Sequence, residues 1–74
     1  MADQELDVRG LSCPLPILKT KKALNSMQSG QTIRVLATDP GSMLDFKAFA
    51  AQTGNTLLEA SEADGVYTFV IQKA

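Results

Sequence analysis

The chain has 74 residues, of which 45% are hydrophobic and 20% charged, and its formal net charge is −1. A chain of this length forms one small domain and buries only about 60% of its unfolded surface, which leaves little room for an enclosed substrate pocket. The nearly neutral charge excludes a general attraction to nucleic acid or to membranes. We therefore expect residues 1–74 to form a single soluble domain.

The sequence contains one cysteine, Cys13, and no histidine. A single cysteine excludes an internal disulfide, C-x-x-C redox chemistry and a multi-cysteine zinc site. Without histidine there is no Cys-His or Ser-His nucleophilic pair. No metal site and no cofactor are expected. Residues 1–5 lack the pattern of a signal peptide, and no apolar run approaches the roughly 20 residues that span a bilayer, so no membrane contact and a cytoplasmic location are expected.

The first predicted element is a strand from Gln4 to Arg9. Leu6 and Val8 alternate with charged residues, and this period of two indicates a strand that is buried on one face. Gly10 follows directly and is expected to adopt a backbone conformation that other residues disfavour.

The first helix is predicted from Pro14 to Met27, because proline is favoured at the first helical position. Cys13 is then the N-cap, where the positive end of the helix dipole should lower the pKa of its thiol and so favour the reactive thiolate. The fixed φ of Pro14 and Pro16 should make the loop stiff, with Gly10 also positioning the thiol. The alternative is a buried structural cysteine.

The first helix carries three lysines, Lys19, Lys21 and Lys22. Lys19 and Lys22 should face solvent, and Lys21 should lie near the edge of the buried stripe. They form a candidate docking surface for an acidic partner or for RNA phosphates, although a solvated helix face also explains them.

The second half of the chain repeats this pattern and then ends in a hairpin. Asp39 is a suitable N-cap for a second helix that begins with Pro40, and Asp64-Gly65 is a favoured hairpin turn. The predicted elements are a strand at Gln31–Ala37, a helix at Pro40–Gln52, and strands at Thr56–Ser61 and Val66–Gln72.

This order predicts an α/β fold, a two-layer α/β sandwich of βαβαββ order. Right-handed crossovers place both helices on one face of a mixed four-stranded sheet. Cys13 and Asp39 should then lie at the same edge of the sheet, where a carboxylate would oppose ionisation of the thiol rather than activate it. The open face is rather apolar and suggests a partner surface, with Arg34, Leu36, Leu57, Val66, Thr68 and Val70.

Three segments together resemble a known family. They are Gly10-Leu11-x-Cys13-Pro14-x-Pro16, Lys21-Lys22-Ala23-Leu24 and Thr38-Asp39-Pro40-Gly41-Ser42. These motifs and the element order resemble the TusA/SirA-type sulfur carrier proteins over essentially the whole chain.

The resemblance implies that Cys13 carries sulfane sulfur as a persulfide. A cysteine desulfurase or a rhodanese would load it, and an acceptor similar to DsrE or TusD would unload it. The sulfur would feed tRNA 2-thiouridine synthesis, dissimilatory sulfur oxidation or molybdenum-cofactor maturation. Asp39, Lys21 and Lys22 would contact partners. Whether such a carrier counts as an enzyme is left open, since no turnover of a free small molecule is expected. A monomer without direct tRNA binding is expected.

Two residues beside the thiol differ from some relatives, since Ser12 stands where some carry Arg and Leu15 where some carry a charged side chain. The partner set can therefore differ as well. Two alternatives also stay open in which the thiol is not used. One is a small RNA-binding module, and the other is a regulatory module that binds a protein through the open sheet face.

Overall fold

The apolar residues that alternate along the strands face one side, and two helices cover that side. The structure, a computed structural model, describes residues 2–74. Its element order is βαβαββ, as predicted. The elements are β1 (Gln4–Val8), α1 (Leu15–Asn25), β2 (Thr32–Ala37), α2 (Ser42–Thr53), β3 (Thr56–Ala63) and β4 (Val66–Gln72).

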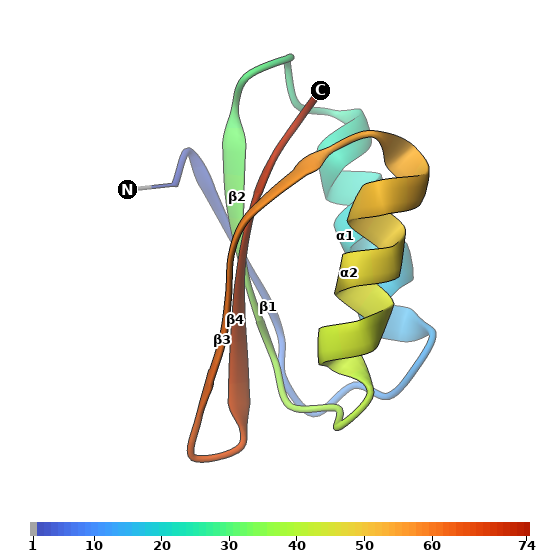
Figure 1. The fold of residues 1–74 in the computed structure, drawn as a ribbon, viewed down its shortest axis with the longest axis vertical. Helices are drawn as coiled ribbons and strands as arrows, with labels where there is room; N and C mark the ends of the chain where they lie inside the picture. Colours follow the sequence, from blue (N-terminus) through green and yellow to red (C-terminus); the bar gives the residue numbers. More distant parts are fainter. Residues whose placement is uncertain (1) are drawn as a thin grey trace.

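The four strands form one mixed sheet in the order β1-β2-β4-β3. β1 is parallel to β2, and β4 is antiparallel to both of its neighbours. Both helices lie on the same face, with α1 over β1 and β2, and α2 over β4 and β3 (Figure 1). The predicted two-layer sandwich is therefore confirmed.

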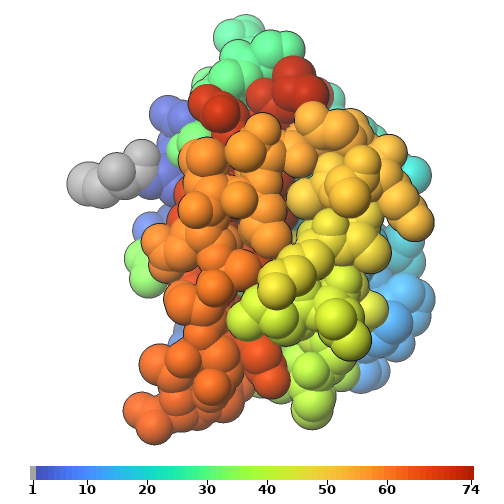
Figure 2. Space-filling view, viewed as in Figure 1, coloured from blue at the N-terminus to red at the C-terminus, as the bar shows by residue number. Residues whose placement is uncertain are grey.

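The core lies between the sheet and the two helices, and Phe46 of α2 lies within it. Its ring stacks on Phe69 of β4 with centroids 4.3 Å apart and meets Phe49 edge-on at 6.5 Å. Figure 2 shows α2 packed beside β3 along one side of the molecule. The buried apolar cluster consists of Val8, Leu24, Met27, Ile33, Val35, Ala37, Phe46, Phe49, Phe69 and Ile71.

The open face of the sheet differs from the prediction at one residue. Leu57 was expected on this face, but it pairs with the buried Ile71 and packs against the core. The register of β3 shifts between Leu57 and Glu59, which is the signature of a β-bulge, and this extra residue breaks the alternation along the strand. Leu58 is instead the exposed leucine of β3, at 53%.

One buried hydroxyl lacks a partner among residues 2–74. Ser42, the first residue of α2, is 1% exposed, and its Oγ accepts and donates no hydrogen bond there. Thr20 of α1 is equally buried, but its Oγ1 donates to the carbonyl of Pro16 at 2.8 Å. These two hydroxyls therefore differ in what their removal should cost.

We expect Ser42→Ala to raise the free energy of unfolding by about 1 kcal/mol, since it removes an unpaired buried polar group. Thr20→Val should instead lower the free energy of unfolding by about 1 kcal/mol, because it removes a buried hydroxyl that makes a hydrogen bond. For a domain of this size, each change corresponds to roughly 4–8 °C in Tm. Thermal unfolding followed by circular dichroism measures both. A clear loss of stability in Ser42→Ala would show that its hydroxyl has a partner, such as a buried water.

Candidate functional site

The loops that follow β1 and β2 meet at one end of the sheet. The backbone N–H of Gly10 donates to Thr38 Oγ1 at 2.9 Å and so ties the two loops together (Figure 1, lower end). Gly10 has φ +82°, in the left-handed region that favours glycine. The N–H of Leu11 donates a hydrogen bond to the carbonyl of Val8 at 3.2 Å. The chain therefore makes a tight bend immediately before the Cys13 segment.

Cys13 lies in a turn ahead of α1 rather than at the N-cap. The N–H of Leu15 donates to the carbonyl of Ser12 at 3.0 Å, which makes Cys13 and Pro14 the central residues of the turn. Pro14, joined to Cys13 by a cis peptide bond, is the N-cap with φ −97° and ψ 12°, so the helix begins at Leu15 and not at Pro14. Pro16 is buried in the first helical turn, and Cys13 is exposed.

Asp39 closes a turn before α2, and the prediction that it is the N-cap of this helix was wrong. Its carbonyl accepts the N–H of Ser42 at 3.0 Å, and its Oδ2 accepts the N–H of Gly41 at 3.1 Å. Pro40 and Gly41 are the central residues of this turn, so the helix begins only at Ser42, with Gly41 as the N-cap. Asp39 nevertheless lies at the same edge of the sheet as Cys13, as expected.

A second carboxylate, that of Asp45, lies beside Asp39. A Cβ built on Gly41 would be 3.2 Å from Asp39 Oδ2 and 3.5 Å from Asp45 Oδ2. Both carboxylates therefore lie against the backbone of Gly41, and Asp45 comes from the first turn of α2.

The electrostatic surroundings raise the pKa of the Cys13 thiol, and the predicted lowering was wrong. Partial desolvation of the thiolate is the largest cause, followed by the charge of Asp45, a hydrogen bond with its carboxylate and the charge of Asp39. Each of these disfavours the thiolate. The thiol therefore stays protonated to a higher pH than a free one. As the pH rises through the pKa of the free thiol toward the raised pKa of the native state, the native state loses stability, because Cys13 ionises more readily in the unfolded chain.

Large apolar side chains lie exposed near the starts of both helices. Leu15 and Leu18 on α1 are 45% and 53% exposed, and Leu44 on α2 is 76% exposed. The only other large hydrophobic residue exposed to this degree within residues 2–74 is Leu58 on the open sheet face. Three of the four exposed large hydrophobic side chains within residues 2–74 therefore lie near the helix starts, at the end that carries Cys13.

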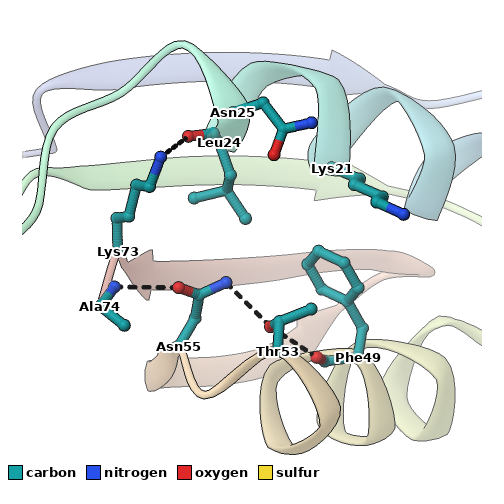
Figure 3. Close-up of a pocket in the computed structure, with 8 residues that line it drawn as sticks. All are labelled: Lys21, Leu24, Asn25, Phe49, Thr53, Asn55, Lys73 and Ala74. Carbon is teal, nitrogen blue, oxygen red and sulfur yellow. Dashed lines mark hydrogen bonds between the residues drawn. The ribbon is translucent and has the colours of Figure 1, made fainter.

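The structure separates the three lysines of α1. Lys19 and Lys22 line a groove of about 360 Å³ on the side of β1. Lys21 lines a different groove, of about 230 Å³, where α1 and α2 end (Figure 3). This second groove lies at the end of the molecule away from Cys13, which precedes the start of α1.

Figure 3 shows how the chain is secured around the second groove. Lys73 Nζ donates to the carbonyl of Leu24 at 2.7 Å, as drawn there, and also to that of Met27 at 2.8 Å. Asn55 accepts the N–H of Ala74 and donates to Thr53. These bonds connect the last residues of the chain to the ends of both helices.

Within residues 2–74, no group of three or more His, Cys, Asp or Glu side chains is arranged to hold a metal ion. None of the helices described is long and apolar enough to cross a bilayer.

Comparison with known proteins identifies the family. The family model described as "Sulfurtransferase TusA" matches residues 4–73. The chain belongs to the TusA family of sulfur carriers. It is 61% identical over 72 residues to the sulfur carrier protein TusA of Allochromatium vinosum, covering 97% of this chain and 95% of that one. The crystal structure of a SirA-like protein from Desulfitobacterium hafniense has a TM-score of 0.81 and 30% identity, covering 93% of this chain and 95% of that one.

TusA family membership implies a sulfur donor and a sulfur acceptor as partners. The structure also shows two residues near the thiol, Asp45 and Thr38, that sequence reasoning missed. Asp45 follows Asp39 at the start of a helix that was predicted to begin at this edge, so its position offered a signal. Thr38 comes directly after β2, at the same edge, and was named only as part of a motif.

We expect Asp45→Asn to lower the pKa of Cys13, since of the two carboxylates Asp45 opposes the thiolate more strongly. Alkylation by iodoacetamide near neutral pH should become several-fold faster, and the ultraviolet thiolate absorbance should appear at lower pH. Asp39→Asn should act in the same direction but less. Glu59→Gln, on the strand farthest from β1, removes the same charge and should change neither. An unaltered titration in Asp45→Asn would contradict this explanation.

Proposed function

We propose that the protein carries sulfane sulfur as a persulfide on Cys13 and passes it from a donor protein to an acceptor protein. The observation that supports this most is the exposed thiol in a loop held by hydrogen bonds. The chain has no other cysteine, so a persulfide on Cys13 cannot be discharged as an internal disulfide.

The transfer needs no metal and no cofactor. The Cys13 thiolate attacks the outer sulfur of a donor persulfide, so that a new S–S bond forms on Cys13 and the donor S–S bond breaks. The donor thiolate leaves and takes up the proton that Cys13 released. An acceptor thiolate later attacks the outer sulfur on Cys13 in the same way, and Cys13 leaves as the thiolate. There is no net oxidation or reduction in either step.

The raised pKa of Cys13 gives the carrier a low reactivity when it is alone. Only the thiolate attacks, and a thiol of higher pKa is also a poorer leaving group. A docked partner that brings a positive charge close to Asp39 and Asp45 would lower the pKa of Cys13, and would so make it both a more populated thiolate and a better leaving group. Exchange would then be faster within a complex than in solution.

Docking onto the Cys13 end of the molecule fits its exposed leucines. Leu15, Leu18 and Leu44 offer apolar contact area, and Asp39 offers a charged contact. We infer that a cysteine desulfurase or a rhodanese loads the carrier here and that an acceptor of the DsrE or TusD type unloads it. The proposal places the protein in the cytoplasm, where a single thiol stays reduced.

The RNA-binding alternative lacks support among the described residues. Phe69 is buried on the side of the sheet that the helices cover, and Tyr67 packs against the same core. Arg34 on the open face is already within 3.7 Å of Glu5. No aromatic platform of the kind that stacks on RNA bases lies on the open face within residues 2–74.

The test is the intact mass of the protein after incubation with a cysteine desulfurase and cysteine, or with a rhodanese and thiosulfate. The mass should increase by one or more sulfur atoms, and dithiothreitol should reverse the increase. Cys13→Ser should gain nothing, whereas Ser12→Ala, which changes the adjacent side chain only, should load normally. A Cys13→Ser variant that still accepts sulfur would refute the proposal.

A further inference from the structure

The two edges of the sheet differ in how they are protected. β3 forms one edge and carries a bulge, which is a feature that discourages further strand pairing. β1 forms the other edge and has neither a bulge nor a proline. It pairs with β2 on one side only, so alternate backbone N–H and C=O groups on its outer side have no strand partner within residues 2–74.

A groove of about 360 Å³ runs beside this free edge. Leu6 of β1 contributes to it from the sheet, and the other lining residues come from a single stripe of α1. That stripe consists of Lys19, Lys22, Ala23 and Ser26. The groove therefore combines apolar contacts at Leu6 and Ala23 with two ammonium groups.

The charge of the groove is of one sign. Among residues 2–74 no carboxylate lines it, and none of the ion pairs there involves Lys19 or Lys22. The acidic residues of β1, Glu5 and Asp7, alternate with Leu6 and therefore face the other side of the sheet, and each is paired with an arginine.

We propose that an extended segment of a partner protein adds to the sheet along β1, with an apolar side chain in the groove and acidic side chains two residues away on either side. The backbone of β1 supplies hydrogen bonds, and side chains at alternate positions supply specificity, as in other cases of strand addition. Those side chains share one face of the added strand and point toward α1. Acidic residues there meet Lys19 and Lys22, whereas basic residues would be repelled.

A second copy of this chain is a poorer occupant of the same edge. Pairing of β1 with β1 around a two-fold axis would bring Lys19 and Lys22 of both copies toward one another on the helix side. Like charges in close apposition oppose such an interface. The structure therefore favours an acidic partner segment over self-association.

The experiment uses the peptide acetyl-Thr-Glu-Thr-Val-Thr-Glu-Thr-amide, which places Glu, Val and Glu on one face of a strand. Titration into the ¹⁵N-labelled full chain should shift the amide signals of Gln4–Val8 saturably and slow their hydrogen exchange. The double variant Lys19→Glu/Lys22→Glu should bind this peptide about three- to tenfold more weakly than the unaltered protein does. A second peptide, with Lys in place of both Glu residues, should bind the double variant more tightly than it binds the unaltered protein.

The matched control is Lys21→Glu/Lys47→Glu, which changes the net charge equally and leaves the groove intact. It should bind the Glu peptide nearly as well as the unaltered protein. Cys13→Ala should also bind it normally, because the thiol does not line the groove, so this test is independent of sulfur carriage. The proposal is overturned by shifts centred on another surface, by β1 shifts that depend on protein concentration without peptide, or by no saturable shift at millimolar peptide.

Discussion

The parallel pairing of β1 with β2 determines where chemistry can occur in this chain. The last register pair, Val8 with Ala37, ends both strands at the same edge, and each strand leads into a loop and then a helix. The segments with Cys13 and Asp39 therefore emerge side by side, although 26 positions separate them in the sequence. The hydrogen bond from Gly10 to Thr38 holds this arrangement. The apolar core lies beneath α1 and α2 and serves to keep the two helix starts in place.

The thiol is subject to opposing influences at this edge. A position near a helix start favours an anion, whereas two carboxylates and partial desolvation disfavour one. Desolvation and the two carboxylates prevail, because a helix dipole amounts to only about half a charge and Cys13 lies one residue outside the N-cap. A carrier benefits from such a balance, since a highly reactive free thiol would react with small oxidants before it met a partner.

Much of the fold could be predicted because it depends on local patterns. Alternation along Leu6 and Val8 and the helical spacing of Phe46 and Phe49 identify strands and helices, and the crossover rule places both helices on one face. The candidate thiol was also evident, since the chain has a single cysteine.

The remaining features depend on geometry that no local pattern encodes. The turn from Ser12 to Leu15 delays the start of α1, and the bulge after Leu57 redirects one side chain of β3. The raised pKa of Cys13 depends on how the first turn of α2 packs beside a loop distant in sequence. Adjacent lysines on α1 face different grooves because successive helical residues point about 100° apart.

The contacts of Lys73 and Ala74 have a practical consequence for experiments with this protein. The backbone of Lys73 exchanges hydrogen bonds with Gly30 and Gln31, and its ammonium group binds the end of α1, so the last residues are firmly anchored. They are anchored at the end of the molecule away from Cys13 (Figure 1). A fluorophore, an affinity handle or a second domain joined after Ala74 would therefore extend away from the thiol and leave it accessible to both donor and acceptor.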